Sequence, residues 1–148
     1  MKPLLQLEHI QKIYGNGGGV TRAIDDISFS VENGEFLGIM GASGSGKTTL
    51  LNCISCYTPA DSGSILLDGV ELARLKEDEL AGVRNQKLGF VFQDFLLLDG
   101  LSVRENILLP AILSGHINST AEARADQLCD VFGIGGIRDK YPLSLIHI

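Results

Sequence analysis

The segment from Gly41 to Thr49, Gly-Ala-Ser-Gly-Ser-Gly-Lys-Thr-Thr, constrains the fold of this 148-residue chain more than any other feature. It matches the pattern G-x-x-x-x-G-K-[ST] through Gly41, Gly46, Lys47 and Thr48. A turn of small residues lets backbone N–H groups converge on phosphate oxygens, and a Cβ at the glycines would push the phosphate away. The segment therefore predicts a phosphate-binding loop.

The surroundings of this loop are those that phosphate binding requires. The apolar run at 36–40 precedes it and predicts a strand buried on both faces, as in a parallel sheet. Residues 47–57 predict a helix, which ends before Pro59 and adds N–H groups and a positive dipole end. Lys47 offers a charge to the β- and γ-phosphates, and Thr48 offers a hydroxyl to Mg²⁺. The candidate nucleotide contacts in the loop are Gly41, Ser43, Gly44, Ser45, Gly46, Lys47, Thr48 and Thr49. Small-molecule kinases, GTPases, helicases and transport ATPases all carry such a loop, so it leaves the activity open.

The rest of the chain predicts further strands and helices, which together indicate an α/β fold. Residues 4–10 and 23–31 alternate apolar and polar side chains, as strands do, with a Gly-rich loop at 15–19 between them. The other predicted elements are hairpin turns at Asn33-Gly34 and Asp68-Gly69, strands at 64–67, 70–72 and 88–92, a helix at 76–84, and helices that open on capping boxes at Ser102–Glu105 and Ser119–Glu122, the second of them running to about Phe132.

Charge and composition exclude several classes of protein. Twelve Lys and Arg against eighteen Asp and Glu give a net charge of −6, which disfavours sequence-independent binding of nucleic acid. No apolar run approaches the ~20 residues that span a bilayer, and the N-terminus carries no secretory signal. Cys53 and Cys56 form a C-x-x-C, but no second pair completes a zinc site, so reduced packing thiols are expected.

Two residues outside the loop narrow the choice of family. Tyr14 precedes the Gly-rich stretch by one residue, and Gln93 follows the apolar run at 88–92. With the phosphate-binding loop between them, they resemble the adenine-stacking aromatic and the Q-loop glutamine of ATP-binding-cassette (ABC) ATPases. The hairpin at 62–69 is similar to the small antiparallel subdomain of that family. The resemblance extends from about Leu4 to Pro142, and it is strongest to the cassettes of lipoprotein-release, macrolide-efflux and bacitracin-type peptide-resistance transporters.

The resemblance implies that the parent protein is the ATP-binding subunit of an ABC transporter, which couples ATP binding and hydrolysis to membrane transport, in export or antimicrobial-peptide resistance. The expected fold is a P-loop NTPase domain of the ABC type, with a mainly parallel core sheet and an N-terminal antiparallel β subdomain. The implied ligands are ATP and Mg²⁺, with Lys47 and Gln93 in catalytic roles, Thr48 and Gln93 at the metal and Tyr14 on the adenine. The implied partners are a transmembrane permease, contacted through the region after Gln93 and the helix beginning near Ser102, and a second cassette bound head to tail. The chain would then lie at the cytoplasmic face of the membrane, held there only by its partner.

The sequence departs from the family toward its end. It contains no signature loop of the Leu-Ser-Gly-Gly-Gln type, no second strand that ends in Asp with a catalytic Glu beside it, and no switch His. Residues 1–142 are therefore expected to be the N-terminal part of an ABC domain, which binds ATP without hydrolysing it. Residues 143–148 are expected to be a non-native tail, because they back-translate to a sequence that resembles a transposon-end adapter.

Two other classes of function stay open at this stage. The first is an ABC-type ATPase that acts in DNA repair or translation without a permease. The breaks at Ser114-Gly-His and Gly133-Ile-Gly-Gly136 argue against the long heptad coiled coil of its chromosome-maintenance members. The second is a P-loop kinase that acts on a small molecule. Such a kinase would not need both Tyr14 and Gln93 at these positions around the loop.

Overall fold

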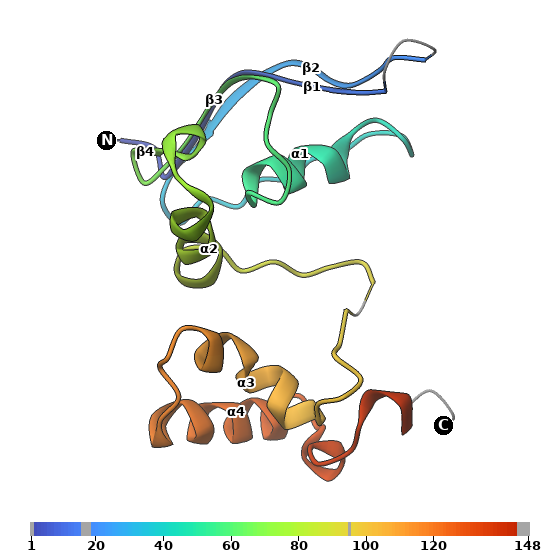
Figure 1. Ribbon diagram of the computed structural model, residues 1–148, viewed down its shortest axis with the longest axis vertical. Helices are drawn as coiled ribbons and strands as arrows, with labels where there is room; N and C mark the ends of the chain where they lie inside the picture. The colour runs from blue at the N-terminus through green and yellow to red at the C-terminus, as the bar shows by residue number, and fades with distance from the viewer. Residues whose placement is uncertain (1, 16–18, 95, 145–148) are drawn as a thin grey trace. The chain divides into compact units, whose positions relative to one another are not determined.

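The chain divides into two units, residues 1–88 (unit 1) and residues 89–148 (unit 2) (Figure 1). The computed structural model describes residues 2–15, 19–94 and 96–144. The central part of the Gly-rich loop predicted at 15–19 and the last four residues of the predicted tail lie outside this range. Leu143 and Ser144 of that tail belong to a 3-10 turn, η3 (Pro142–Ser144).

Unit 1 contains an antiparallel sheet of four strands in the order β2-β1-β3-β4. Its strands are β1 (Leu5–Tyr14), β2 (Thr21–Val31), β3 (Ser62–Leu67) and β4 (Val70–Glu71). Asp68 (φ 52°) and Gly69 (φ 77°) join β3 to β4, and positive φ angles at both positions are typical of a tight hairpin turn. The predicted N-terminal antiparallel subdomain is thus confirmed, with its Asp-Gly turn.

A β-bulge in β1 sets which side chains reach the core. Leu7 pairs with Phe29 and Ile10 pairs with Ile27, so two residues of β1 lie opposite one residue of β2. His9, inside the bulge, has a φ of 51°. Because the bulge adds one residue, Leu7 and Ile10 point to the same face and both are fully buried. Strict alternation, which the sequence pattern assumes, would place them on opposite faces.

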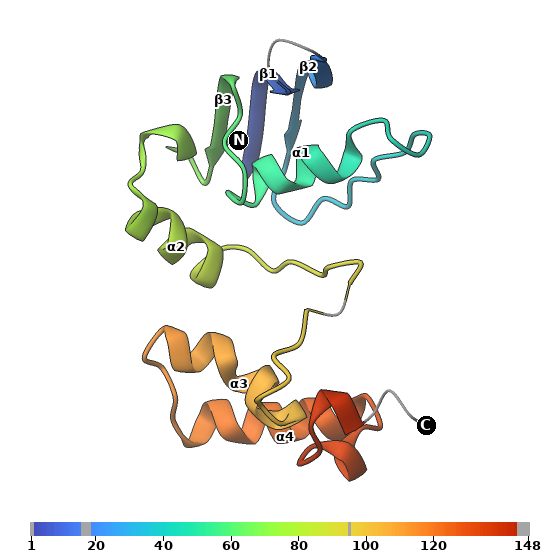
Figure 2. The same cartoon turned by 45° about the vertical axis from the view of Figure 1, so that its right-hand side comes forward.

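Helix α1 (Lys47–Ile54) lies across one face of this sheet (Figure 2). Its buried residues Leu50 and Cys53 are three positions apart, so they share one side of the helix. They close a core whose buried members are Leu7, Ile10, Ile24, Leu50, Cys53, Ile65 and Leu72. The turn η1 (Leu72–Arg74) and helix α2 (Glu77–Gln86) follow β4, and Leu80 and Val83 of α2 pack against the edge of this core.

The two segments predicted as parallel core strands, 36–40 and 88–92, have irregular backbone. Phe36 and Val91 are each 97% exposed. The turn predicted at Asn33-Gly34 is present, with Gly34 at φ 81°, but no paired strand follows it. An apolar run predicts burial, whereas a strand also needs a neighbour for its N–H and C=O groups. Within residues 2–15, 19–94 and 96–144, every paired strand is antiparallel.

Unit 2 is built on the helix pair α3 (Val103–Leu113) and α4 (Ser119–Val131), followed by the turn η2 (Gly135–Ile137). The capping box predicted at Ser102 is confirmed. The Glu105 amide donates to Ser102 Oγ at 3.2 Å, and the Ser102 amide donates to Glu105 Oε2 at 2.7 Å. The second predicted box is wrong by one residue. Asn118 caps α4 by accepting from the Ala121 amide at 3.0 Å, and Ser119 is the first helical residue.

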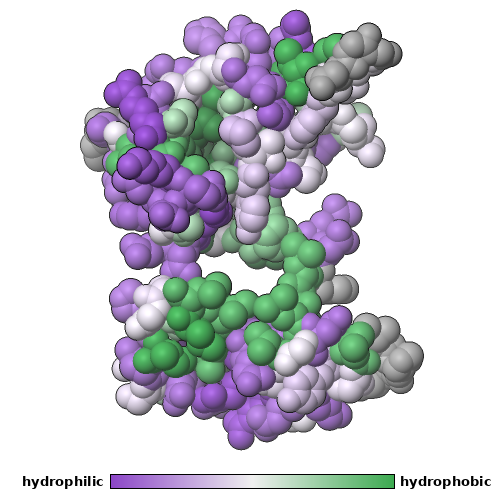
Figure 3. All heavy atoms as spheres, in the orientation of Figure 1, coloured by the Kyte–Doolittle hydropathy of each residue, from purple (hydrophilic) through white to green (hydrophobic). Residues whose placement is uncertain are grey.

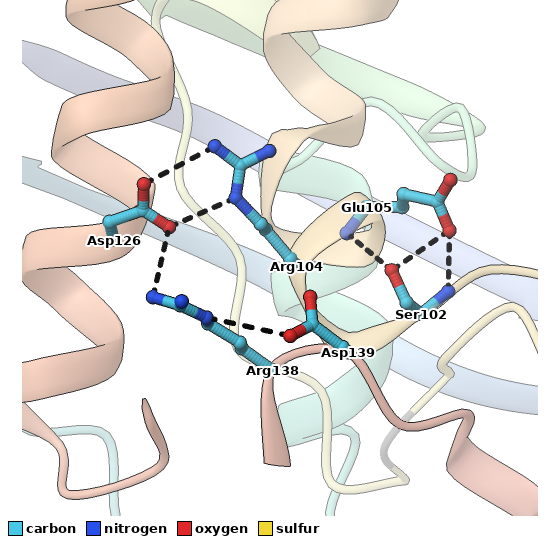
Figure 4. A network of polar contacts seen from close by, with 6 residues as sticks. All are labelled: Ser102, Arg104, Glu105, Asp126, Arg138 and Asp139. Atoms are coloured by element: carbon cyan, nitrogen blue, oxygen red, sulfur yellow. Dashed lines mark hydrogen bonds and ion pairs between the residues drawn. The ribbon is translucent and has the colours of Figure 1, made fainter. Parts of the chain in front are cut away.

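An ionic network joins the two helices of unit 2 to the segment after η2 (Figure 4). Arg104 donates to both oxygens of Asp126, at 2.9 and 3.3 Å, and Arg138 lies 3.9 Å from the same carboxylate. The bond from Arg104 lowers the pKa of Asp126. The backbone adds two further links, because the Val103 and Arg104 amides donate to the carbonyls of Lys140 and Arg138. These bonds satisfy N–H groups that the helix itself leaves unpaired.

Apolar side chains gather on the surface of unit 2 over α3 (Figure 3). Ile112 and Leu113, at the end of that helix, are among its exposed apolar residues. Among the residues that the structure describes, no helix is both long enough and apolar enough to cross a bilayer.

Candidate functional site: an anion-binding loop at the start of α1

The loop at 41–46 makes a tight turn that leads directly into α1. The Ser45 amide donates to the Ala42 carbonyl at 3.2 Å, which closes the turn. Gly44 lies inside the turn with a φ of 78°, and Gly46 ends it with a φ of 89°. Residues 41–45 are all exposed. The loop predicted from the sequence therefore has an open surface and two positions where the left-handed backbone favours glycine.

Gly46 is also needed for lack of space. A Cβ on Gly46 would lie 2.1 Å from the Ala23 carbonyl oxygen of β2, which is far inside van der Waals contact. Gly46 thus lets the start of α1 approach the sheet. A Cβ on Gly41 would lie 2.7 Å from Ser45 Oγ, a side-chain atom that can rotate away, so this contact alone does not require glycine at position 41.

The start of α1 is free to receive an anion. Its N-cap, Gly46, has no side chain that could accept from the first-turn amides, and the first turn holds no acidic residue. The first amides of an α-helix have no acceptor within the helix, and they carry the positive end of its dipole. Thr48 is exposed in this turn and Thr49 is partly buried. The residues present therefore fit a phosphate group.

Lys47 supplies a full positive charge to the same place. Its Nζ donates to the carbonyl of Gly41 at 2.8 Å, to the carbonyl of Ala42 at 2.6 Å and to Ser45 Oγ at 3.1 Å. The ammonium is thus folded back onto its own loop. A cation, several free amides and a set of glycines within one short segment make a site suited to a polyphosphate.

Tyr14 lies at the end of the β1–β2 hairpin, near the same loop. It pairs with Thr21, and Ala23, two residues further along β2, is the residue that Gly46 contacts. Two residues of a strand span about 7 Å, so the backbone of Tyr14 lies in the same region of unit 1 as the loop. Tyr14 is 43% exposed.

An ion pair between the buried Lys12 and the exposed Asp61, next to Tyr14, was not predicted from the sequence. Lys12 Nζ donates to Asp61 Oδ1 at 2.8 Å and lies 5.5 Å from the centre of the Tyr14 ring. The hydrogen bond to Asp61 raises the pKa of Lys12, and the same bond lowers the pKa of Asp61, with help from the Ile13 amide. The partners are 49 positions apart, and the bulge in β1 disguises the buried position of Lys12, so no local pattern reveals the pair.

Gln93 lies in unit 2, where it is exposed and follows the irregular segment 88–92. The phosphate-binding loop belongs to unit 1, so the predicted meeting of Gln93 with Mg²⁺ stays a prediction. Within the described ranges, no group of three or more His, Cys, Asp and Glu residues is placed to hold a metal ion.

The cysteines of the C-x-x-C are free thiols, as predicted. Cys53 is buried and Cys56 is partly buried, and burial raises the pKa of both. They line a cavity of about 450 Å³ between the end of α1, β3 and α2, together with apolar residues such as Ile65 and Leu80. Their surroundings are those of packing residues.

Comparison with known proteins gives one family. The family model described as "ABC transporter" matches residues 24–145. The bacitracin export ATP-binding protein BceA of Halalkalibacterium halodurans is 46% identical over 139 residues, which is 94% of this chain and 55% of BceA. The ABC transporter ATP-binding protein YxdL of Bacillus subtilis is 46% identical over 140 residues, 95% of this chain and 54% of YxdL. The macrolide export ATP-binding/permease protein MacB of Neisseria meningitidis is 39% identical over 142 residues, 96% of this chain and 22% of MacB.

The solved structures agree with this result. The dimeric post-hydrolysis structure of the ATP-binding cassette MJ0796, bound to ADP and Pi, has a TM-score of 0.86 at 32% identity, covering 93% of this chain and 61% of that one. A second dimeric MJ0796 structure has a TM-score of 0.85 at 31% identity, covering 95% of this chain and 62% of that one. The chain spans about half the length of BceA and YxdL, and about a fifth of MacB.

Proposed function

The chain belongs to the ABC transporter family, and from that premise we propose that it is the ATP-binding part of an export transporter. Members of this family are ATPases with a common fold, which the MJ0796 structures represent. The observation that carries the proposal is the geometry at the start of α1. The loop is open, the helix has no side-chain cap, and the Lys47 ammonium lies on the loop.

We propose that separate groups of residues bind the phosphates, the Mg²⁺ ion and the adenine of Mg-ATP. The amides of the loop and Lys47 hold the β- and γ-phosphates, and the Thr48 hydroxyl is a ligand of Mg²⁺. Tyr14 stacks on the adenine, and its exposure at the end of β1 supports this role. Gln93 contributes its amide oxygen to the metal or to a water molecule. The remaining loop contacts are Gly41, Ser43, Gly44, Ser45, Gly46 and Thr49.

The transported substrate and the partners follow from the relatives. The names of BceA and MacB refer to the export of bacitracin and of macrolides, so we propose an antimicrobial compound as cargo. MacB carries a permease in its name, and the MJ0796 structures are dimeric. We therefore propose that this cassette pairs with a second copy and binds a transmembrane permease, which holds it at the cytoplasmic face. The exposed apolar side chains over α3 support a protein contact on unit 2.

We also propose that these 148 residues bind Mg-ATP without hydrolysing it. Phosphoryl transfer to water needs a positioned nucleophile as well as neutralised phosphate charge. The sequence holds the phosphate-binding loop and Gln93, but it contains neither a signature loop nor the catalytic Glu of the family.

Calorimetry with Mg-ATP tests the proposed site directly. Lys47→Ala is expected to weaken binding about 10- to 150-fold, because a charge-assisted hydrogen bond is worth roughly 1.5–3 kcal/mol. Lys87→Ala is the matched control, because Lys87 is an exposed lysine of the same unit that pairs with Asp68 at 3.3 Å. The proposal fails if the wild-type chain shows no magnesium-dependent binding of ATP, or if the two variants bind equally well. Phosphate release by the wild-type chain, abolished by Lys47→Ala, would contradict the proposed lack of turnover.

A further inference from the structure

We propose that Lys12 and Asp61 are positioning residues, which fix the Tyr14 ring in the orientation in which it stacks on the nucleotide base. This inference rests on the proposed function, because it concerns the base end of the same ATP site. It assigns a role to an ion pair between the buried Lys12 of β1 and the exposed Asp61, the residue before β3, a pair that the phosphate-binding loop does not use.

Lys12 lies directly against the ring. Its Nζ is 5.5 Å from the centre of the Tyr14 ring, within the range of a cation–π contact. The ammonium therefore occupies one side of the ring.

Asp61 holds Lys12 in this position through three contacts with consecutive residues of β1. Its carboxylate accepts from Lys12 Nζ at 2.8 Å and from the Ile13 amide at 2.7 Å. Its own amide donates to the Gln11 carbonyl at 2.9 Å. The aspartate is thus fixed to the strand by its backbone, while its two oxygens fix the lysine and the peptide that leads to Tyr14.

The pair acts through Tyr14, since a ligand has little access to the lysine. Lys12 is 8% exposed, whereas Tyr14 is 43% exposed. A base that stacks on the tyrosine meets the ring, and the ammonium stays beneath the surface. Lys12 is charged at neutral pH, as lysines ordinarily are, and its hydrogen bond to Asp61 raises its pKa further.

We expect the ion pair to increase the affinity for ATP by holding the Tyr14 ring in place before the base binds. A free tyrosine side chain loses freedom when a base stacks on it, and a ring that is already fixed loses less. Truncating an aromatic residue that stacks on a base weakens binding by about 5- to 150-fold. Loss of a cation–π contact at a partly exposed ring corresponds to about 2- to 5-fold. Lys12→Met should therefore have a smaller effect than Tyr14→Ala, and only on ligands that contain a base.

The experiment compares two ligands, Mg-ATP and magnesium tripolyphosphate, on the full chain by calorimetry. Tripolyphosphate carries the phosphates without the base, so it reports on the loop alone. The variants are Lys12→Met, which keeps most of the apolar stem, Tyr14→Ala, and the double variant. Lys87→Met is the control for loss of a lysine elsewhere in unit 1. Asp61→Asn is the second test of the pair, because it removes the negative charge, and its single amide oxygen can accept from Lys12 or from Ile13 but cannot replace both carboxylate oxygens.

The expected result is a loss specific to ATP. Lys12→Met should weaken the binding of Mg-ATP about 2- to 5-fold, and Asp61→Asn should also weaken it. Both variants should leave the binding of tripolyphosphate unchanged. In the Tyr14→Ala background, Lys12→Met should have no further effect. Equal losses for both ligands, or independent effects in the double variant, would overturn the inference while leaving the ATP site intact. If the wild-type chain binds neither ligand, the proposed function falls, and this inference falls with it.

Discussion

The replacement of Gly46 by alanine tests the geometry of the phosphate-binding loop most sharply. Gly46 has a φ of 89°, and a Cβ at this position would lie 2.1 Å from the Ala23 carbonyl oxygen. Alanine therefore meets two obstacles, an unfavourable backbone conformation and a collision with β2. Gly44 provides a matched control, because its φ is 78° and a Cβ there has no atom within 4 Å.

The backbone strain and the collision cost different amounts of free energy. The left-handed backbone costs alanine about 1–2 kcal/mol at either position. Relief of the collision at Gly46 requires the start of α1 to move about 1.3 Å from the sheet, the difference between 2.1 Å and an ordinary contact of 3.4 Å. Overpacking of this kind costs about 1–3 kcal/mol. The free energy of unfolding should therefore fall by about 2–5 kcal/mol in Gly46→Ala and by about 1–2 kcal/mol in Gly44→Ala.

Two measurements compare Gly46→Ala with Gly44→Ala. Urea unfolding followed by circular dichroism reports the stability, and hydrogen exchange reports the start of α1 through the Leu50 amide, which donates to the Gly46 carbonyl at 2.9 Å. The Leu50 amide should exchange faster in Gly46→Ala than in Gly44→Ala. Equal stability and equal exchange in the two variants would refute the argument, because they would show that β2 does not restrict residue 46.

Two further predictions concern unit 2. Asn118→Ala should lower the stability of α4 by about 1 kcal/mol, while Ser119→Ala should change it by less than about 0.5 kcal/mol, because Asn118 is the cap. Hydrogen exchange at the Ala121 amide distinguishes the two variants, and a larger effect of Ser119→Ala would restore the cap predicted from the sequence. The folded pKa of Asp126 is lowered by Arg104, so its contribution to stability is complete above the ordinary Asp pKa of about 3.9 and is lost as the pH falls through the lower folded value. Acid titration of unit 2 helicity should show this loss in the wild-type chain and a weaker dependence in Asp126→Asn; parallel curves would contradict the role of the ion pair.

The features that the sequence predicted well depend on neighbours along the chain. The loop before Lys47, the Asp68-Gly69 turn and the capping box at Ser102 all arise from residues within a few positions of one another. The cap of α4 was misplaced because Asn118 and Ser119 are both good caps, and only the backbone decides between them.

The features that the sequence could not predict depend on distant partners. The bulge at His9 breaks the alternation of β1, and the buried Lys12 that follows it bonds to the exposed Asp61, 49 positions later. The apolar runs that contain Phe36 and Val91 predicted buried strands, but a run carries no information about the strand that pairs with it. Hydrophobicity indicates that a segment can be buried, and hydrogen-bonded pairing depends on the rest of the fold.

The backbone bonds between the start of α3 and the segment 138–140 have a consequence for how unit 2 folds. The Val103 and Arg104 amides receive their acceptors from residues that come about 35 positions later in the chain. Closing a flexible loop of that length costs roughly 3 kcal/mol of chain entropy, so these bonds form late unless the helices have already shortened the path. Pairing of α3 with α4 should therefore come first and the docking of residues 138–140 second. A protease cut between Gly133 and Gly136 would then leave the helices in place and loosen only the first turn of α3.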